Sequence, residues 1–180
     1  MRSLISTCAA AALLLGPVLG RAGLAHAQSM AGLKGHDSNA PVDVSAQRIE
    51  VQDRADRAVF AGDVRVRQAN LTLDTQRLTI AYSNSKSGIQ MQRLDASGGV
   101  VVRSPSETAR GAFGVYDLNR KLITLVGGVQ LDAAGSRING ARMVIDLTSG
   151  RATVDGGARG TDGSGGRVTG RFNVNQRGKN

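Results

Sequence analysis

Histidine and cysteine, the side chains that most often act as nucleophiles, bases or metal ligands, are scarce in this 180-residue chain. The single cysteine is Cys8, and the two histidines are His26 and His36, all within the N-terminal fifth. The central part of the chain therefore cannot assemble a Ser-His-Asp or Cys-His set, or a His/Cys metal cluster. The sequence predicts a protein that is not an enzyme and uses no metal or cofactor.

Acidic and glycine-rich segments offer the remaining chemistry. Asp and Glu are scattered, and no pattern brings two of them together as an acid–base pair. The segment 156–166, GGARGTDGSGG, lacks the Gly-Lys-Ser/Thr of a phosphate-binding loop and holds only one imperfect copy of a glycine-aspartate calcium repeat. We interpret it as a flexible loop.

The first 27 residues have the three parts of a secretory signal peptide. Arg2 supplies the positive start, Ala9–Gly20 the apolar run and Ala25–Ala27 a small-x-small cleavage site. The apolar run falls short of the ~20 residues that a membrane span needs. We expect cleavage near Ala27, export, and a mature chain of residues 28–180 without cysteine.

The exported part is basic. Without Arg2 and Arg21 the 23 Lys+Arg become 21, against 14 Asp+Glu, which leaves a charge of +7. This balance favours anionic partners in general, or serves only solubility. Nucleic acid is not expected as a partner, because the chain is exported and has few aromatic residues to stack on bases.

Apolar residues alternate with polar ones from Pro41 onward, as in Val42 and Val44 or Val64 and Val66. This period of two is typical of strands with one buried face. The sequence therefore predicts an all-β domain over residues 41–174. A flexible lead-in at 28–40 precedes it and a disordered tail at 175–180 follows it.

A repeat runs through this domain, marked by the spelling x-Gly-x-Val-x-Val. Its glycines are Gly62, Gly98, Gly127 and Gly156, at spacings of 36, 29 and 29 residues. The longer first interval has room for an extra loop around Ser83–Gly88. A unit of about 29 residues, with roughly three short strands, is too small to bury its own apolar face, so the units should stack. Each glycine is expected at a bulge or tight bend.

The residues predicted to face inward are small aliphatics. They either fill a close-packed core or line a groove or half-open barrel that holds alkyl chains. The candidate lipid-binding residues of the second interpretation are Val42, Val44, Ile49, Val51, Val64, Val66, Leu73, Ile80, Val100, Val102, Val129, Leu131, Met143 and Ile145.

A stack of units has two ends with unpaired backbone groups. Such edges favour strand addition by another chain, so head-to-tail association of copies is one expectation. The alternative is that the lead-in and the last strand, Arg167–Val174, cover the ends instead.

Several segments together resemble the OstA-like (LptA) family. Pro41–Val51, PVDVSAQRIEV, and Ala58–Leu78, AVFAGDVRVRQANLTLDTQRL, are similar to the start of that domain. Leu122–Leu131 and Ser136–Leu147 are similar to its second half. The family's element x-F-x-G-x-V-x-V-x-Q stands here as Phe60, Gly62, Val64, Val66 and Gln68.

The resemblance implies an open, twisted, solenoid-like β-jellyroll of antiparallel strands in the periplasm. Its interior would receive the lipid A acyl chains of lipopolysaccharide during transport from the inner to the outer membrane, with Val42 and Val44 at the family's lipid-contacting positions. It also implies head-to-tail homo-oligomers and partners with related domains, one anchored in the inner membrane and one in the outer membrane. Phosphates of the lipid would meet arginines at the groove rim, for which Arg48, Arg77 and Arg142 are candidates.

Two other interpretations stay open. One is a structural β-repeat scaffold or filament with a packed interior and no lipid cargo. The other is an anchored relative that does not form a bridge, which cleavage of the signal peptide would exclude.

Overall fold

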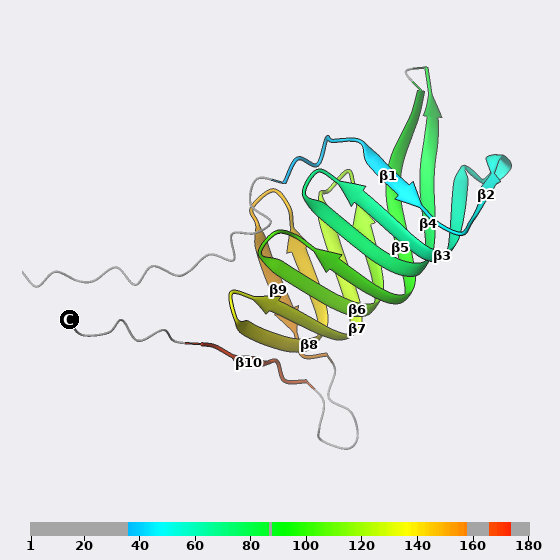
Figure 1. Ribbon diagram of the computed structural model, residues 1–180. Coiled ribbons are helices and arrows are strands. Elements are labelled where there is room, and N and C mark those ends of the chain that lie inside the picture. Colours follow the sequence, from blue (N-terminus) through cyan, green and yellow to red (C-terminus); the bar gives the residue numbers. More distant parts are fainter. Residues whose placement is uncertain (1–35, 87, 158–165, 174–180) are drawn as a thin grey trace, which may run out of the picture.

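The computed structural model describes residues 36–86, 88–157 and 166–173, and nearly all of them lie in one ten-stranded sheet (Figure 1). All the pairings are antiparallel, which confirms the predicted open all-β fold. The predicted signal peptide and most of the glycine-rich loop lie outside the described residues. Among the residues that are described, no helix has the length and apolar character needed to cross a membrane. The elements are β1 (Val42–Ser45), β2 (Arg48–Gln52), a short 3-10 helix η1 (Asp53–Ala55), β3 (Arg57–Gln68), β4 (Leu71–Ser85), β5 (Gly88–Arg103), β6 (Glu107–Asp117), β7 (Leu122–Ala133), β8 (Ser136–Asp146), β9 (Arg151–Asp155) and β10 (Thr169–Arg171).

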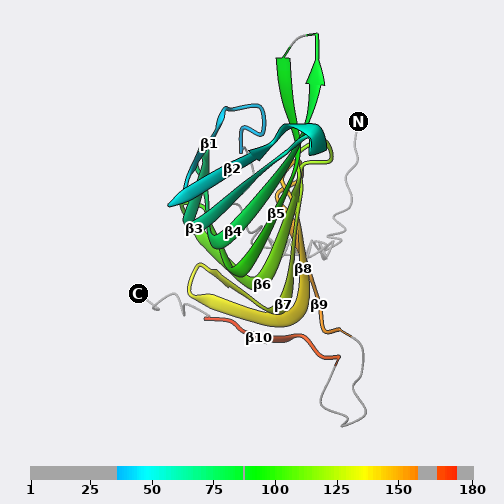
Figure 2. The ribbon, with the colours of Figure 1, turned by 90° about the vertical axis from the view of Figure 1, so that its right-hand side faces the viewer.

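The strands β3 to β8 each bend near the middle, so the single sheet folds into two facing layers (Figures 1 and 2). We call these layers arm A and arm B. Arm A begins with β1 and ends with β10, whereas arm B begins with β2 and ends with β9. The turns between strands lie at the tips of the arms, and the open side between the tips is called the mouth.

Glycines allow the bend. The strand register shifts between Ser97 and Val100 in β5 and again between Val126 and Val129 in β7. Gly127, inside the second shift, has a φ of +84°, and a Cβ built there would lie 2.7 Å from the Cβ of Ala112 on β6. Only glycine fits such an approach without displacing a neighbour. The predicted bulges are therefore confirmed at Gly62, Gly98 and Gly127, whereas Gly156 follows the end of β9 and lies at no register shift.

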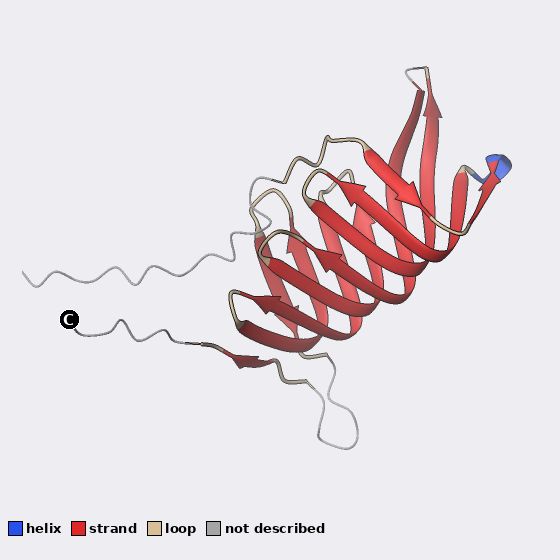
Figure 3. Ribbon diagram, viewed as in Figure 1, coloured by secondary structure: helices blue, strands red, loops and turns tan. Residues whose placement is uncertain are grey.

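The strands are longer than predicted. Each repeat holds two strands of 11 to 16 residues rather than about three short ones, from β3 to β8. The bulge turns the strand but lets the ladder continue beyond it, so the glycine lies within a strand and not between two strands. The extra residues of the first repeat likewise lengthen β4 and β5 into a projecting hairpin (Figure 3).

Candidate functional site

The two arms face each other with apolar inner surfaces that continue from strand to strand. Residues directly opposite in an antiparallel ladder point to the same face, so each set of cross-strand partners makes a row. The inner row of arm A is Val44, Val66, Leu73, Val102, Ala109, Leu131 and Ile138. The inner rows of arm B are Phe60, Leu78, Ala96, Gly114, Leu125, Met143 and Val154, and Ala58, Ile80, Leu94, Tyr116, Ile123, Ile145 and Ala152.

The two inner surfaces pack into one cluster, and most of the predicted interior residues belong to it. Val42 and Val44, on the edge strand β1, are partly buried and pack against it. Ten further candidates are buried in it, namely Val64, Val66, Leu73, Ile80, Val100, Val102, Val129, Leu131, Met143 and Ile145. The cluster also contains buried residues that were not predicted although the same alternation marks them, among them Leu78, Leu94, Ile123 and Leu125.

Ile49 and Val51 are not enclosed. They lie on β2 opposite Phe60 and Ala58, so their parity is that of the inner rows of arm B. Their exposed fractions are nevertheless 54% and 66%. The reason is position, because β2 is the edge strand of arm B.

The predicted rim arginines are not at the mouth. All three lie in one cross-strand row just beyond the bend, namely Arg48, Arg77 and Arg142. Each precedes an inner residue by one position, so its side chain points to the opposite face of the sheet. They are exposed on the outer face of arm B. Arg48 pairs with Glu50 at 3.5 Å and Arg142 with Asp155 at 3.6 Å. Strand parity thus turns these arginines away from the interior, and a contact with lipid phosphates at these positions stays a prediction.

Polar side chains close the mouth. Gln68 ends β3 at the tip of arm A, and Tyr116 lies one residue before the end of β6 at the tip of arm B. The Tyr116 hydroxyl donates to Oε1 of Gln68 at 2.9 Å, which ties the two tips together. Burial raises the pKa of the Tyr116 hydroxyl still further above neutral pH. Neither residue was predicted from the sequence. The alternation along β3 does place Gln68 on the inward side, and a polar residue at such a position indicates a functional role.

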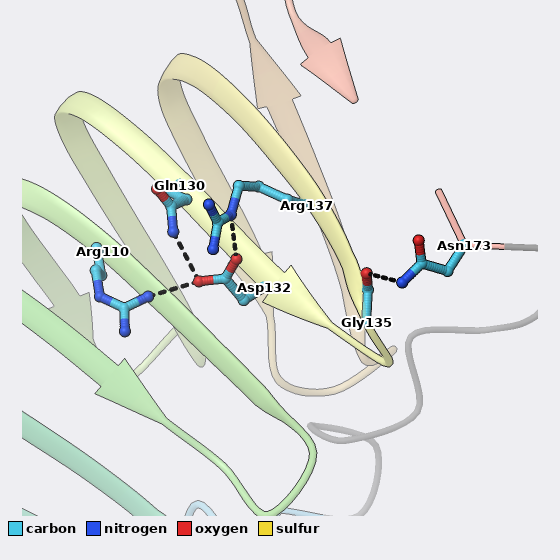
Figure 4. Close-up of polar contacts among 6 residues, drawn as sticks. All are labelled: Arg110, Gln130, Asp132, Gly135, Arg137 and Asn173. Carbon is cyan, nitrogen blue, oxygen red and sulfur yellow. Dashed lines mark hydrogen bonds and ion pairs between the residues drawn. The ribbon is translucent and has the colours of Figure 1, made fainter. Parts of the chain in front are cut away.

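The outer face carries ion pairs at the tip of arm A (Figure 4). Asp132 accepts hydrogen bonds from Arg137, Arg110 and Gln130, each at 2.7 Å. The bond from Arg137, helped by those from Gln130 and Arg110, holds the pKa of Asp132 below its usual range against partial desolvation. Close by, Asn173 donates to the Gly135 carbonyl at 2.9 Å and fixes the chain after β10. These contacts tie β6, β7 and β8 together at the tip of arm A, where two guanidinium groups share one carboxylate.

A metal centre finds no support in the part of the chain that the structure describes. No group of three His, Cys, Asp or Glu side chains there could hold an ion. What the described residues do offer is an aliphatic interior between two arms, with one polar tie at its mouth.

Comparisons with known proteins agree with this architecture. A family model described as LptA/(LptD N-terminal domain) LPS transport protein matches residues 43–151. An uncharacterized protein of Rhizobium meliloti (strain 1021), R00383, is 27% identical over 159 residues, which cover 84% of this chain and 85% of that protein. Among solved structures, LptH, the LptA homologous periplasmic component of the lipopolysaccharide transport device of Pseudomonas aeruginosa, matches with a TM-score of 0.65 and 20% identity. That match covers 77% of this chain and 99% of LptH.

Proposed function

Because the chain belongs to the LptA/LptD N-terminal domain family of lipopolysaccharide (LPS) transport proteins, we propose that it shields LPS acyl chains between its two arms in the periplasm. It is then a transport component without enzymatic activity, and forms part of a bridge from the inner to the outer membrane. The observation that carries the proposal is the continuity of the apolar inner rows, which run from β3 to β9 in arm B and from β1 to β8 in arm A. Away from the mouth, the buried polar side chain among the described inward residues is Thr75, whose hydroxyl donates to the Ser97 carbonyl near the bend.

Alkyl chains that are exposed to water have a high free-energy cost. Each methylene left in water costs ~0.8 kcal/mol, so a lipid with several acyl chains cannot cross an aqueous compartment unshielded. Away from the mouth, the aliphatic wall offers similar burial at every strand, so no position along the wall would hold the acyl chains strongly.

Loading requires the arms to separate. Near the bend, a Cβ built at Gly114 on arm B would lie 3.1 Å from Cγ1 of Val100 on arm A, so the inner faces are in contact there. Acyl chains would replace contacts between aliphatic side chains with contacts of the same kind. The net cost of opening is therefore lower than the exposure of the two surfaces to water would suggest.

Association at the ends would extend the interior. The edge strand β2 presents Ile49 and Val51, and the edge strand β9 presents Val154 and Ala152 in the same two inner rows. In the antiparallel order of the sheet, β2 of one copy can follow β9 of another and place Ile49 beside Val154 and Val51 beside Ala152. This arrangement buries the two exposed residues and continues the groove into a second copy or a related domain.

The tight burial of the inner side chains favours a second candidate, a scaffold with a permanently packed interior. Photocrosslinking to LPS in cells separates the two functions. A photoreactive residue at Val44 would report on the interior, and one at the neighbouring Ser45, which is exposed and faces the other side of β1, is the matched control. We expect an LPS adduct at Val44 and none at Ser45. A folded protein without an adduct at Val44 would leave the scaffold as the function.

A further inference from the structure

The segment just before β1 lies in the mouth, between the tips of the two arms (Figure 1). We call residues 36–40 the strap. His36 is buried, and its Nε2 lies 3.2 Å from Oε1 of Gln68. The Nδ1 atom of His36 lies 3.0 Å from the side-chain oxygen of Asn70, in the turn after β3. The strap is therefore held by polar contacts to arm A and not by apolar packing.

Gln68 joins the strap to both arms. Its side chain is only 3% exposed, and its Nε2 donates to the carbonyl of Ser38 at 3.0 Å and to that of Ala40 at 3.1 Å. Its Oε1 accepts from the Tyr116 hydroxyl of arm B. Both hydrogens and the oxygen of this amide are thus used. A buried amide that lost these partners would cost ~1–3 kcal/mol, so the strap can leave only if other polar groups replace it.

The replacement must offer acceptor oxygens to Nε2 of Gln68, because two acceptor oxygens of the strap occupy that position now. An amphiphile whose acyl chains lie between the arms places its ester and amide linkages where the chains leave the apolar interior. The linkage carbonyls have the same acceptor chemistry as the Ser38 and Ala40 carbonyls. When the arms separate, the single hydrogen of the Tyr116 hydroxyl leaves Oε1 of Gln68 and becomes available to a further oxygen.

We propose that Gln68 and Tyr116 form a polar subsite for the acyl-linkage carbonyls of the lipid, and that the strap occupies this subsite until lipid displaces it. This inference rests on the proposed function, since it assumes acyl chains in the interior. The subsite would also explain why a glutamine ends the x-Val-x-Val-x-Gln element. A residue that only lined the apolar interior would not need an amide.

Strap displacement can be measured in the full chain with Cys8 replaced by serine. Spin labels on cysteines at Asn39, which is exposed on the strap, and at Asn119, which is exposed in the turn after β6, report the distance between strap and arm B. Purified LPS should shift the distance distribution to longer values. LPS from which the ester-linked chains have been removed should shift it less.

Two substitutions should have opposite effects on the Kd for LPS. His36→Ala weakens the strap but leaves the Gln68 amide and the Tyr116 hydroxyl in place, so LPS should bind about 3- to 10-fold more tightly. Adding Gln68→Leu to that variant removes the subsite and should weaken binding by about 5- to 30-fold relative to His36→Ala alone. Thermal unfolding of both variants shows whether the fold is kept.

The outcomes separate this inference from the proposed function. If LPS binds but the labels do not move, the subsite is wrong and the proposed function stands. If His36→Ala and the double variant bind LPS equally, the subsite is also wrong. If LPS binds to no form of the folded chain, the proposed function fails and this inference fails with it. The label experiment needs no substitution in the interior, so it remains decisive even where Gln68→Leu prevents folding.

Discussion

At the scale of single residues, strand parity decides which way each side chain points. The neighbouring strands decide what surrounds that side chain. Arg77 and Leu78 are adjacent in sequence, yet one is exposed on the outer face and the other is fully buried. Asp132 shows the same principle on the outer face, where its partners come from three strands: Gln130 shares β7 with it, whereas Arg110 lies on β6 and Arg137 on β8. Such a carboxylate contributes to stability only while it is charged.

The Asp132 cluster should make stability depend on pH. The folded pKa of Asp132 is lowered, chiefly by the hydrogen bond from Arg137, so its contribution is present above the unfolded pKa of about 4 and is lost as the pH falls through the folded pKa. Asp132→Asn should therefore reduce the free energy of unfolding at pH 7 by less than about 1 kcal/mol, since the cluster is partly exposed. The difference should become smaller as the pH falls below about 4.

Urea unfolding at several pH values measures this effect. A double-mutant cycle with Arg137→Gln isolates the pair, because the two losses should be less than additive if the carboxylate and the guanidinium act together. A loss in Asp132→Asn that is as large at pH 3 as at pH 7 would show that the carboxylate charge is not its cause.

At the scale of elements, the bent strand is the unit from which the two arms are built. Two neighbouring glycines at the bend of β7 have different surroundings. A Cβ built at Gly127 would lie 2.7 Å from the Cβ of Ala112, whereas one at Gly128 would meet no atom within 4 Å. Both have positive φ, +84° and +63°. The pair therefore separates backbone strain from steric conflict.

Gly127→Ala should destabilise the fold more than Gly128→Ala. The second substitution adds only the left-handed backbone penalty of about 1–2 kcal/mol. The first adds a clash with a neighbouring strand that cannot move without disturbing the ladder, for about 2–4 kcal/mol in total. Urea midpoints with a common m-value give the comparison, and an equal or larger loss for Gly128→Ala would contradict the steric account of the bend.

At the scale of the whole molecule, the two ends of the sheet are different. At the start, β1 and β2 are both edge strands and β2 exposes Ile49 and Val51, whereas at the other end β9 and β10 are the edges. Such a molecule can associate in one direction, with the start of one copy against the end of the next. Contact of this type joins two different surfaces, so each added copy leaves an end free for the next unless the rotation between copies closes a ring.

Disulfide crosslinking tests the register of this contact. In the Cys8→Ser background, a chain carrying Ile49→Cys and Val154→Cys should form crosslinked dimers and longer oligomers under mild oxidation. Glu50→Cys with Val154→Cys is the matched control, because Glu50 points to the outer face and should crosslink much less. Equal crosslinking of the two pairs, or none at all in concentrated samples, would exclude an antiparallel β2–β9 contact with Ile49 beside Val154.

The sequence by itself determined the fold class, the repeat, the bulges and the family. These follow from local rules, since alternation sets the parity of side chains and a glycine repeated at fixed spacing marks the same bend in the first three units. Gly98 and Gly127 illustrate this, because each lies at a register shift with a positive φ.

Only the tertiary structure decided which inward residues are enclosed, which face carries the arginines and what closes the mouth. Parity gives Ile49 and Leu78 the same side of the sheet, but burial also needs neighbouring strands and a facing layer, and only Leu78 has them. The contacts of Gln68 with His36 and Tyr116 join residues 32 and 48 positions apart. Local patterns hold no information about such pairs, because they form only when the two arms fold onto each other.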